Sequence, residues 1–535
     1  MTLDRRAFMA GVVATAVVAG TGVGAGCSDD NESDARDAPT TTLPPIPEDL
    51  PSEVFALGVA SGDPLPRSVI LWTRLVADLA ADDGGVGTAP LPVRWEVASD
   101  EEFVDMVVDG TALAEPALGH SVHVEAGHLQ PDNTYWYRFK LGDRTSPVGR
   151  TRTAPADDAD PAGLRFAFAS CQNFQDGHWT PYEHMAGEEL DLVLFLGDYI
   201  YEGAPDPAAV RTYRTEAPTD LAGYRRRWAE YKSDPALQGV HQQVPWVVTW
   251  DDHEVANDYA DDIPQEATGT DTAAREAFLD RRAAAYQAFY EHQPVRLPPP
   301  DGPDYPIHRD VGWGRLARFY VLDGRQYRSD QACTDQVVLA GAGPLCADAE
   351  GEDRTMLGAD QEAWLGDALA ASEARWNVVA QQTVVAHVPL TGQAPDALVN
   401  LDQWDGYPAA RRRLVDQLRD VRNPVVITGD IHLAGVGLIN DDPDDVTSAP
   451  LATELVGTSI SSSFPVPDLV EGTIGALPNT RYVNARQRGY VVCTVERDQL
   501  TAEFRVVRTV DRPESSVATD AVWVVDDGDP DPHEP

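Results

Sequence analysis

The stretch LVLFLGDYIY, residues 192–201, decides the fold class of this chain. Its first five residues are all apolar, which is typical of a strand buried on both faces of a sheet. Asp198 and Tyr201 follow directly, so a carboxylate and a phenol stand just beyond the strand. Ligand sites of α/β proteins form beyond the carboxyl ends of their strands. The stretch therefore predicts an α/β fold with functional side chains at this strand end.

Four further apolar runs predict other strands of the same buried, mixed α/β sheet. They cover residues 165–169, 246–250, 378–380 and 425–427, and helix-length segments separate them. Each run is followed by polar residues, as residues 192–196 are. Because parallel strands bring their carboxyl ends to one edge, we expect these polar side chains to share one site.

Two of these strand ends offer carboxylate, imidazole and amide donors. In TGDIH, residues 428–432, the i, i+2 spacing on an extended segment puts Asp430 and His432 on one side. WDDHEVAN, residues 250–257, is dense in oxygen and nitrogen donors, and the amide oxygen of Asn257 suits a hard cation. Both motifs predict metal ligation.

A third strand end, FASCQN at residues 168–173, places the thiol of Cys171 beside polar residues. Structural roles are the alternative for all these donors. Asp198 would then cap a helix, Tyr201 and His432 would be satisfied core residues, and Cys171 would pack as a small hydrophobe.

The region before this sheet has a different pattern. Residues 68–72, 93–97, 121–124 and 135–139 alternate apolar and polar side chains between turns, which predicts a β-sandwich of about a hundred residues. The aromatic strand at 135–139 resembles that of a fibronectin type III-like module.

The charge balance excludes one class of partner. The 535 residues contain 41 Lys and Arg against 87 Asp and Glu, a formal net charge of −46. Such a chain repels nucleic acids and anionic lipids, so no basic nucleic-acid-binding groove is expected. If its substrate is an anion, the positive charge must be local, and bound metal ions are the most compact source.

The N-terminus predicts export. An arginine pair at residues 5–6 precedes an apolar stretch, 11–25, that is too short for a membrane span. Residues 1–27 therefore resemble a twin-arginine signal, with the twin-arginine translocase as a partner, and 28–49 form a linker. Two outcomes stay open, lipid anchoring at Cys27 or cleavage and release, in the cell envelope or outside the cell.

The remaining cysteines and the C-terminus give smaller predictions. In an oxidising compartment, Cys333 and Cys346 are expected to form a disulfide. Cys493 lies in an apolar strand and is expected to be an inert, buried thiol. Residues 526–535 are predicted to form an acidic, solvated tail.

Together the motifs resemble the PhoD-like alkaline phosphatases of the calcineurin-like metallophosphoesterase superfamily. The resemblance covers FALGVASGDP (55–64), ASCQ (169–172), GDYIYE (197–202), WDDHE (250–254) and GDIH (429–432). It implies an N-terminal β-sandwich over residues 50–154, followed by a four-layer α/β sandwich, the catalytic metallophosphoesterase domain, over residues 155–525. The family also uses twin-arginine export.

The resemblance also implies a ligand set. Iron(III) would be held by Cys171, Asp198, Tyr201 and His432. One or two calcium ions would lie beside the iron, and Asp198 would bridge to a calcium that Asn257 and Asp430 would also hold. Anionic thiolate, phenolate and carboxylate donors stabilise a trivalent ion, whereas carboxylate and amide oxygens suit calcium.

Two further residues are candidates for the reaction itself. His253 would orient the substrate or protonate the leaving group, with a structural role beside Asn257 as the alternative. Gly203 stands where family members often carry a polar or basic stretch, so Arg211, with Arg214, is the substitute candidate for binding phosphate. A solvated surface position is the alternative for both arginines.

The predicted function is that of an exported alkaline phosphatase that hydrolyses small phosphomonoesters and phosphodiesters. Metal ions would generate the attacking hydroxide from bound water. Two alternatives remain. One is a phospholipase D-like phosphodiesterase. The other is a non-catalytic cell-surface binding protein in which the β-sandwich carries the function.

Overall fold

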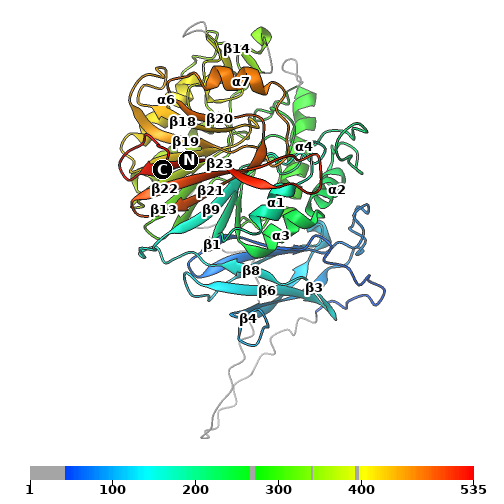
Figure 1. Ribbon diagram of the computed structural model, residues 1–535. Coiled ribbons are helices and arrows are strands. Elements are labelled where there is room, and N and C mark those ends of the chain that lie inside the picture. The colour runs from blue at the N-terminus through cyan, green and yellow to red at the C-terminus, as the bar shows by residue number, and fades with distance from the viewer. Residues whose placement is uncertain (1–42, 266–271, 339–340, 392–396) are drawn as a thin grey trace, which may run out of the picture. The chain divides into compact units, whose positions relative to one another are not determined.

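The computed structural model describes residues 43–265, 272–338, 341–391 and 397–535 (Figure 1). The predicted export signal, including Cys27, and the linker as far as residue 42 lie outside the described residues. Within the described ranges, no helix is both long enough and apolar enough to cross a membrane.

The four strands predicted in the N-terminal region are present and belong to two facing sheets. One sheet contains β3 (Leu91–Ala98), β4 (Met106–Ala114), β6 (Thr134–Leu141), β7 (Arg144–Thr145) and β8 (Gly149–Arg152). The other side is formed by β1 (Val59–Leu65), β2 (Ser68–Arg74) and β5 (Ser121–Ala126). Buried residues from both sides, such as Leu71 and Tyr137, pack in one cluster between them.

This N-terminal region differs from the predicted module in one respect, because one of its sheets continues into the rest of the protein. β1 pairs in parallel with β11 (Trp246–Val248), which makes a nine-stranded sheet in the order β23-β22-β21-β9-β10-β11-β1-β2-β5. The pairing covers an edge of β11 that would otherwise expose unpaired backbone groups. The remaining strands are β9 (Leu164–Ala169), β10 (Leu192–Phe195), β21 (Arg488–Val495), β22 (Gln499–Val507) and β23 (Val517–Asp526).

The five predicted α/β strands are all present, but they lie in two sheets and not in one. β15 (Trp376–Ala380) and β17 (Pro424–Thr428) belong to a seven-stranded sheet in the order β12-β13-β15-β17-β19-β18-β20. Its other strands are β12 (Arg309–Trp313), β13 (Ala317–Val321), β18 (Ala434–Asn440), β19 (Pro450–Val456) and β20 (Thr480–Asn484). Side chains of both sheets, including Phe166 and Ile427, form one buried cluster, so each sheet covers an apolar face of the other.

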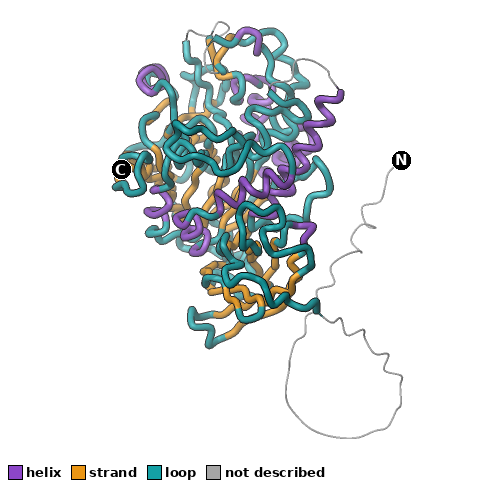
Figure 2. Tube along the Cα trace, turned by 90° about the vertical axis from the view of Figure 1, so that its right-hand side faces the viewer, coloured by secondary structure: helices purple, strands orange, loops and turns teal. Residues whose placement is uncertain are grey.

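Helices bury the opposite faces of the two sheets. α1 (Thr180–Met185), α2 (Leu221–Lys232), α3 (Pro235–Gln243) and α4 (Thr272–His292) share a core cluster with β9, β10 and β11. α5 (Gly358–Ala370) and α6 (Pro408–Leu418) share another with β13, β15 and β17. Figure 2 shows helices outside the strands. The mixed α/β class is therefore confirmed.

Three smaller predictions can be compared with the structure. Cys333 and Cys346 form the expected disulfide, with 5.8 Å between their Cα atoms, and Cys493 is a buried free thiol. The acidic C-terminal segment, residues 526–535, is largely exposed, but it is also held against the body of the protein. Asp531 pairs with Arg481 at 2.8 Å, because arginines of the body attract its carboxylate.

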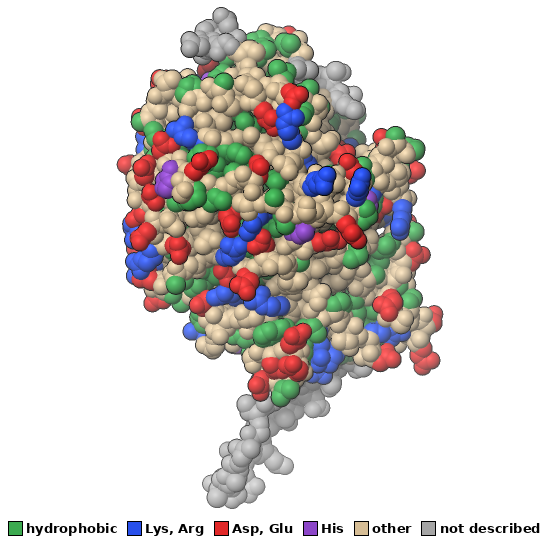
Figure 3. Space-filling model, in the orientation of Figure 1, with side chains coloured by type: hydrophobic (Ala, Val, Ile, Leu, Met, Phe, Trp, Pro, Cys, Tyr) green, Lys and Arg blue, Asp and Glu red, His purple; other side chains and the backbone are tan. Residues whose placement is uncertain are grey.

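On the face shown in Figure 3, acidic side chains stand among basic ones.

Candidate metal centre

Four strands end at the candidate site, and each leads into a turn that carries donor atoms. β9 precedes Cys171, β10 precedes Asp198, β11 precedes Asp252, and β17 precedes Asp430. Three of these strands belong to the nine-stranded sheet and β17 to the other. The backbone N–H of Cys171 donates to the carbonyl of Gly197 at 3.1 Å, which ties two of the turns together. The site thus lies where the carboxyl ends of both sheets meet.

The backbone at these turns is strained. Cys171, Asp198, Asp430 and His432 have φ values of 58°, 59°, 63° and 57°, in the left-handed region. Such conformations cost a non-glycine residue roughly 1–3 kcal/mol and cluster at functional sites. A Cβ on Gly429 would lie 2.4 Å from Ser170 Oγ, so these two turns also approach as closely as glycine permits. Strain at four donor residues supports a functional role for them.

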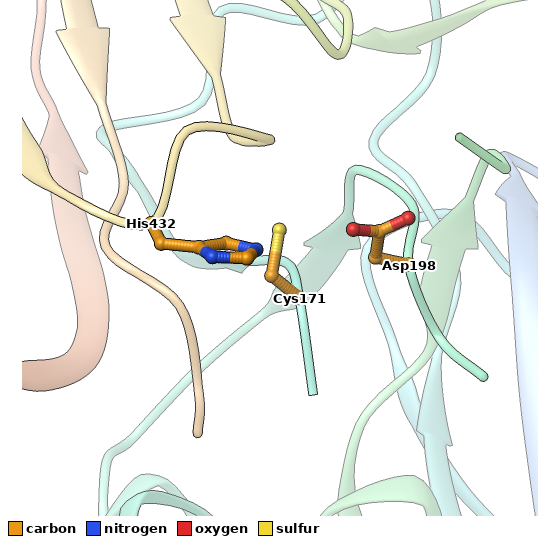
Figure 4. Close-up of side chains that lie close together, drawn as sticks. All are labelled: Cys171, Asp198 and His432. Carbon is orange, nitrogen blue, oxygen red and sulfur yellow. The ribbon is translucent and has the colours of Figure 1, made fainter. Parts of the chain in front are cut away.

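The predicted iron ligands lie together. Donor atoms of Cys171, Asp198 and His432 are all within 4.8 Å of one another. In Figure 4 the side chains of His432 and Asp198 lie on either side of the Cys171 sulfur. The Tyr201 hydroxyl donates to Asp198 Oδ2 at 2.8 Å and lies 3.2 Å from Nε2 of His432.

The electrostatics of this group favour a bound cation. Burial raises the pKa of the Cys171 thiol and of the Tyr201 phenol well above their ordinary values, and the Asp198 carboxylate raises both further. Burial likewise raises the pKa of Asp198 and lowers that of His432 to about 4. Three potential anions in one buried space need positive charge to ionise together. A donor set with thiolate and imidazole groups fits a transition-metal ion.

A second group extends from the first through a shared residue. Asp198 also lies with Asp252 and His253 in a set whose donor atoms are within 4.8 Å. Asn257 and Asp430 line the same cavity as Asp198. The Asn257 amide nitrogen donates to Gln265 Oε1 at 2.8 Å, which leaves its oxygen available to a cation. Oxygen donors of this kind fit calcium, and the position of Asp198 suits a bridging carboxylate.

A third group, Asp251, Asp252 and Asp430, already contains a cation from the chain itself. The fully buried Arg325 pairs with Asp251, and its Nη2 lies 2.8 Å from Asp430 Oδ1. Arg325 was missed in the sequence, although it follows strand β13 and the strand-end rule that found Asp198 could have found it.

His253 is held by a carboxylate that the sequence analysis did not assign. Its Nδ1 lies 2.7 Å from Glu202 Oε2, and its ring stacks on Tyr201 with 4.1 Å between centroids. Burial lowers the pKa of His253, but the charges of Glu202 and Asp198 outweigh burial and raise it well above the ordinary value. His253 also lines the cavity, so the structure places it beside the predicted ligands.

Glu254 ends the WDDHE motif, residues 250–254, and the sequence alone predicted no role for it. Its carboxylate accepts the backbone N–H groups of Asp198, Tyr199 and Asp251 at 3.1, 2.6 and 2.9 Å. Glu254 is itself buried, so it fixes the turns after β10 and β11 against each other.

Arg211 is not brought to the other predicted residues. Its Nη1 pairs with Asp234 Oδ2 at 2.9 Å, and its guanidinium lies 3.9 Å from the ring centre of Phe174. It is absent from the described residues that line the cavity, and Arg214 is exposed. Phosphate binding by Arg211 stays a prediction.

The fold and these donor groups define a sheet-rich α/β protein with a candidate metal centre. A family model described as PhoD-like phosphatase matches residues 166–504, and a model of the PhoD-like phosphatase N-terminal domain matches residues 41–155. This chain belongs to the PhoD-like phosphatase family, and is thus a phosphoric ester hydrolase.

Two relatives agree with this assignment. Alkaline phosphatase D of Bacillus subtilis (strain 168) is 45% identical over 481 residues, which cover 88% of this chain and 80% of the relative. A solved structure described as the structure of PhoD has a TM-score of 0.84 and 43% identity, covering 90% of this chain and 92% of that one.

Proposed function

We propose that this protein is an exported, metal-dependent alkaline phosphatase that hydrolyses small phosphomonoesters and phosphodiesters. The observation that carries the proposal is the convergence of Cys171, Asp198, Tyr201 and His432 from two sheets on one buried point. We assign these residues to iron(III), and Asp198, Asn257 and Asp430 to calcium. The membership of Asp198 in two donor groups supports its role as the bridge.

The chain's own residues would prepare the site as follows. When bound, the metal ions supply a hydroxide nucleophile and positive charge for the phosphoryl oxygens. Glu254 fixes the backbone of Asp198, so this carboxylate keeps its position. Glu202 holds Nδ1 of His253, which leaves Nε2 to donate a proton to the leaving-group oxygen.

The finer points of fold and location belong to the same proposal. We assign residues 50–154 to a fibronectin type III-like sandwich and residues 155–525 to a four-layer α/β sandwich. The core clusters between the two sheets and under the helices on both sides support the layered arrangement. Residues 1–27 would direct twin-arginine export to the cell envelope or beyond, with Cys27 either lipidated or removed.

The test measures the metal content of natively exported protein. It also measures hydrolysis of p-nitrophenyl phosphate and bis-p-nitrophenyl phosphate by the same protein. Chelation should abolish turnover, and restored iron and calcium should recover it. Asp444→Asn, a partly exposed acidic site, is the matched control for ligand variants. Full turnover by metal-free protein would contradict the proposal. Choline release from phosphatidylcholine without phosphate release would favour the phospholipase D-like alternative.

A further inference from the structure

The cavity beside the candidate metal centre has two unlike walls. It measures about 450 Å³. One end is formed by polar donors, Asp198, Asp252, His253, Asp430 and His432. The other end is apolar and is formed by residues such as Leu390, Leu398 and Phe464, together with the helix α7 (Pro467–Ile474).

Helix α7 turns one face toward this cavity. Five residues at this helix line the cavity, and each is three or four positions from another of them: Val466, Leu469, Val470, Thr473 and Ile474. This spacing puts them on one helical face. An amphipathic helix normally buries such a face in the core. Here Val470 and Ile474 are only partly buried where they pack against the core cluster of the seven-stranded sheet, and Leu469 is 57% exposed.

The other face of α7 is tied down by polar contacts. Glu471 accepts a hydrogen bond from Arg486 Nε at 2.9 Å and another from the backbone N–H of Ala485 at 3.0 Å. α7 lies next to β20 and stands at the same end of the protein as β14 (Figure 1). The fold therefore holds the apolar face of α7 in place over the cavity.

An apolar wall that stays partly open to water is unfavourable unless a ligand covers the open part. Burial of apolar surface contributes about 25 cal/mol per Å². The cavity also has the size of small-molecule sites, which are largely apolar with a few polar groups that fix orientation. A ligand that spans both ends must be amphiphilic, with its polar part at Asp198 and its apolar part at α7.

We propose that the α7 wall is a subsite for an apolar alkyl or aryl group of the phosphoester substrate. The inference rests on the proposed function, because it places the phosphoryl group at the metal centre. The apolar group comes either from a soluble ester or from a lipid. Leu469 and Val470 are specificity-determining residues in this assignment.

The first experiment measures kcat/KM for p-nitrophenyl phosphodiesters that carry methyl, butyl or hexyl groups. We expect an increase of up to about fourfold for each added methylene, because one CH₂ contributes about 0.8 kcal/mol on burial. Leu469→Asp and Thr473→Asp should reduce the ratio of hexyl to methyl kcat/KM by tenfold or more. Val104 is an exposed apolar residue in the loop between β3 and β4, in the N-terminal region. Val104→Asp should therefore leave this ratio unchanged.

The second experiment measures the binding of methyl and hexyl phosphonate by calorimetry and does not depend on turnover. Tighter binding of hexyl phosphonate with a more negative heat-capacity change supports the subsite. Equal affinities for both phosphonates overturn it, as does a flat chain-length profile in an active enzyme. Chain-length-dependent binding without hydrolysis of any ester overturns the proposed function alone.

Phosphatidylcholine vesicles separate the two sources of the apolar group. Hydrolysis of soluble hexyl esters but not of vesicles assigns the subsite to small alkyl or aryl esters. Hydrolysis of both assigns it to lipids, and either result supports the apolar subsite.

Discussion

Two neighbouring groups of buried carboxylates in this protein are neutralised in different ways. Asp251, Asp252 and Asp430 surround the guanidinium of Arg325. Asp198 lies beside Cys171 and Tyr201, and among the described residues no lysine or arginine pairs with it. Folding supplies the first group with the permanent charge of a guanidinium, whereas the second group has the His253 imidazole, whose charge Glu202 shares.

The difference indicates which carboxylate is the better candidate for a metal ligand. A buried carboxylate is costly unless a cation lies close to it. Where the chain contributes that cation, a carboxylate can be structural, as Asp251 is beside Arg325. Where folding supplies no arginine or lysine, as at Asp198, a bound metal ion is the candidate source of further positive charge. Density of acidic residues alone therefore does not identify a metal site.

The largest expected effect is at Asp198, the residue shared by two donor groups. Asp198→Asn removes a negative charge from both candidate metal positions, so we expect turnover to fall about a thousandfold or more and both metals to be depleted. Circular dichroism should stay native. A variant that keeps both metals and more than a tenth of the activity would remove the bridging role.

The second effect concerns Arg325. Arg325→Met leaves a buried cluster of carboxylates without its counter-ion, so we expect the free energy of unfolding to fall by roughly 3–5 kcal/mol. This loss of stability should shrink as the pH is lowered from 8 to 5, because protonation of the clustered carboxylates removes the repulsion between them.

Arg413→Met is the control for that experiment, since Arg413 pairs with Glu362 at 2.8 Å nearer the surface. Its cost should stay below about 1 kcal/mol. If urea unfolding gives equal losses of unfolding free energy for the two variants, Arg325 is not the counter-ion on which its acidic group depends.

The third effect tests the thiol. Cys171→Ser replaces a potential thiolate by an alcohol that is a much weaker anionic donor, so the iron content and any charge-transfer colour should fall. Cys493→Ser is the matched control, because Cys493 is the other buried free cysteine in the described part of the chain and lies in β21, outside the donor groups. Equal iron content in both variants would mean that Cys171 is a core residue.

The smallest effect is expected at Arg211. Its contacts with Asp234 and Phe174 indicate that Arg211→Ala lowers stability by about 1 kcal/mol and changes KM less than threefold. A tenfold or larger rise in KM for p-nitrophenyl phosphate would instead support the phosphate-binding role that the sequence suggested.

Local patterns were enough to predict the strands and most of the candidate ligands. Residues 192–196 form a continuous apolar run before Asp198, and such a run with a polar end is visible without any long-range information. The disulfide between Cys333 and Cys346 was predictable for a similar reason, since the two cysteines are only 13 residues apart. These features depend on neighbours along the chain.

The sequence by itself determined the α/β class and the strand ends, and it predicted the candidate donor residues Asp198, Tyr201, Asp430 and His432. Only the tertiary structure decided that the strands divide into two sheets, and that Arg325, 74 residues from Asp251, neutralises one acidic group. It also decided that α7 presents an apolar face to the cavity. An apolar run shows that a strand is buried but not which partner buries it, and the charge of a carboxylate shows that it needs a cation but not which one packing supplies.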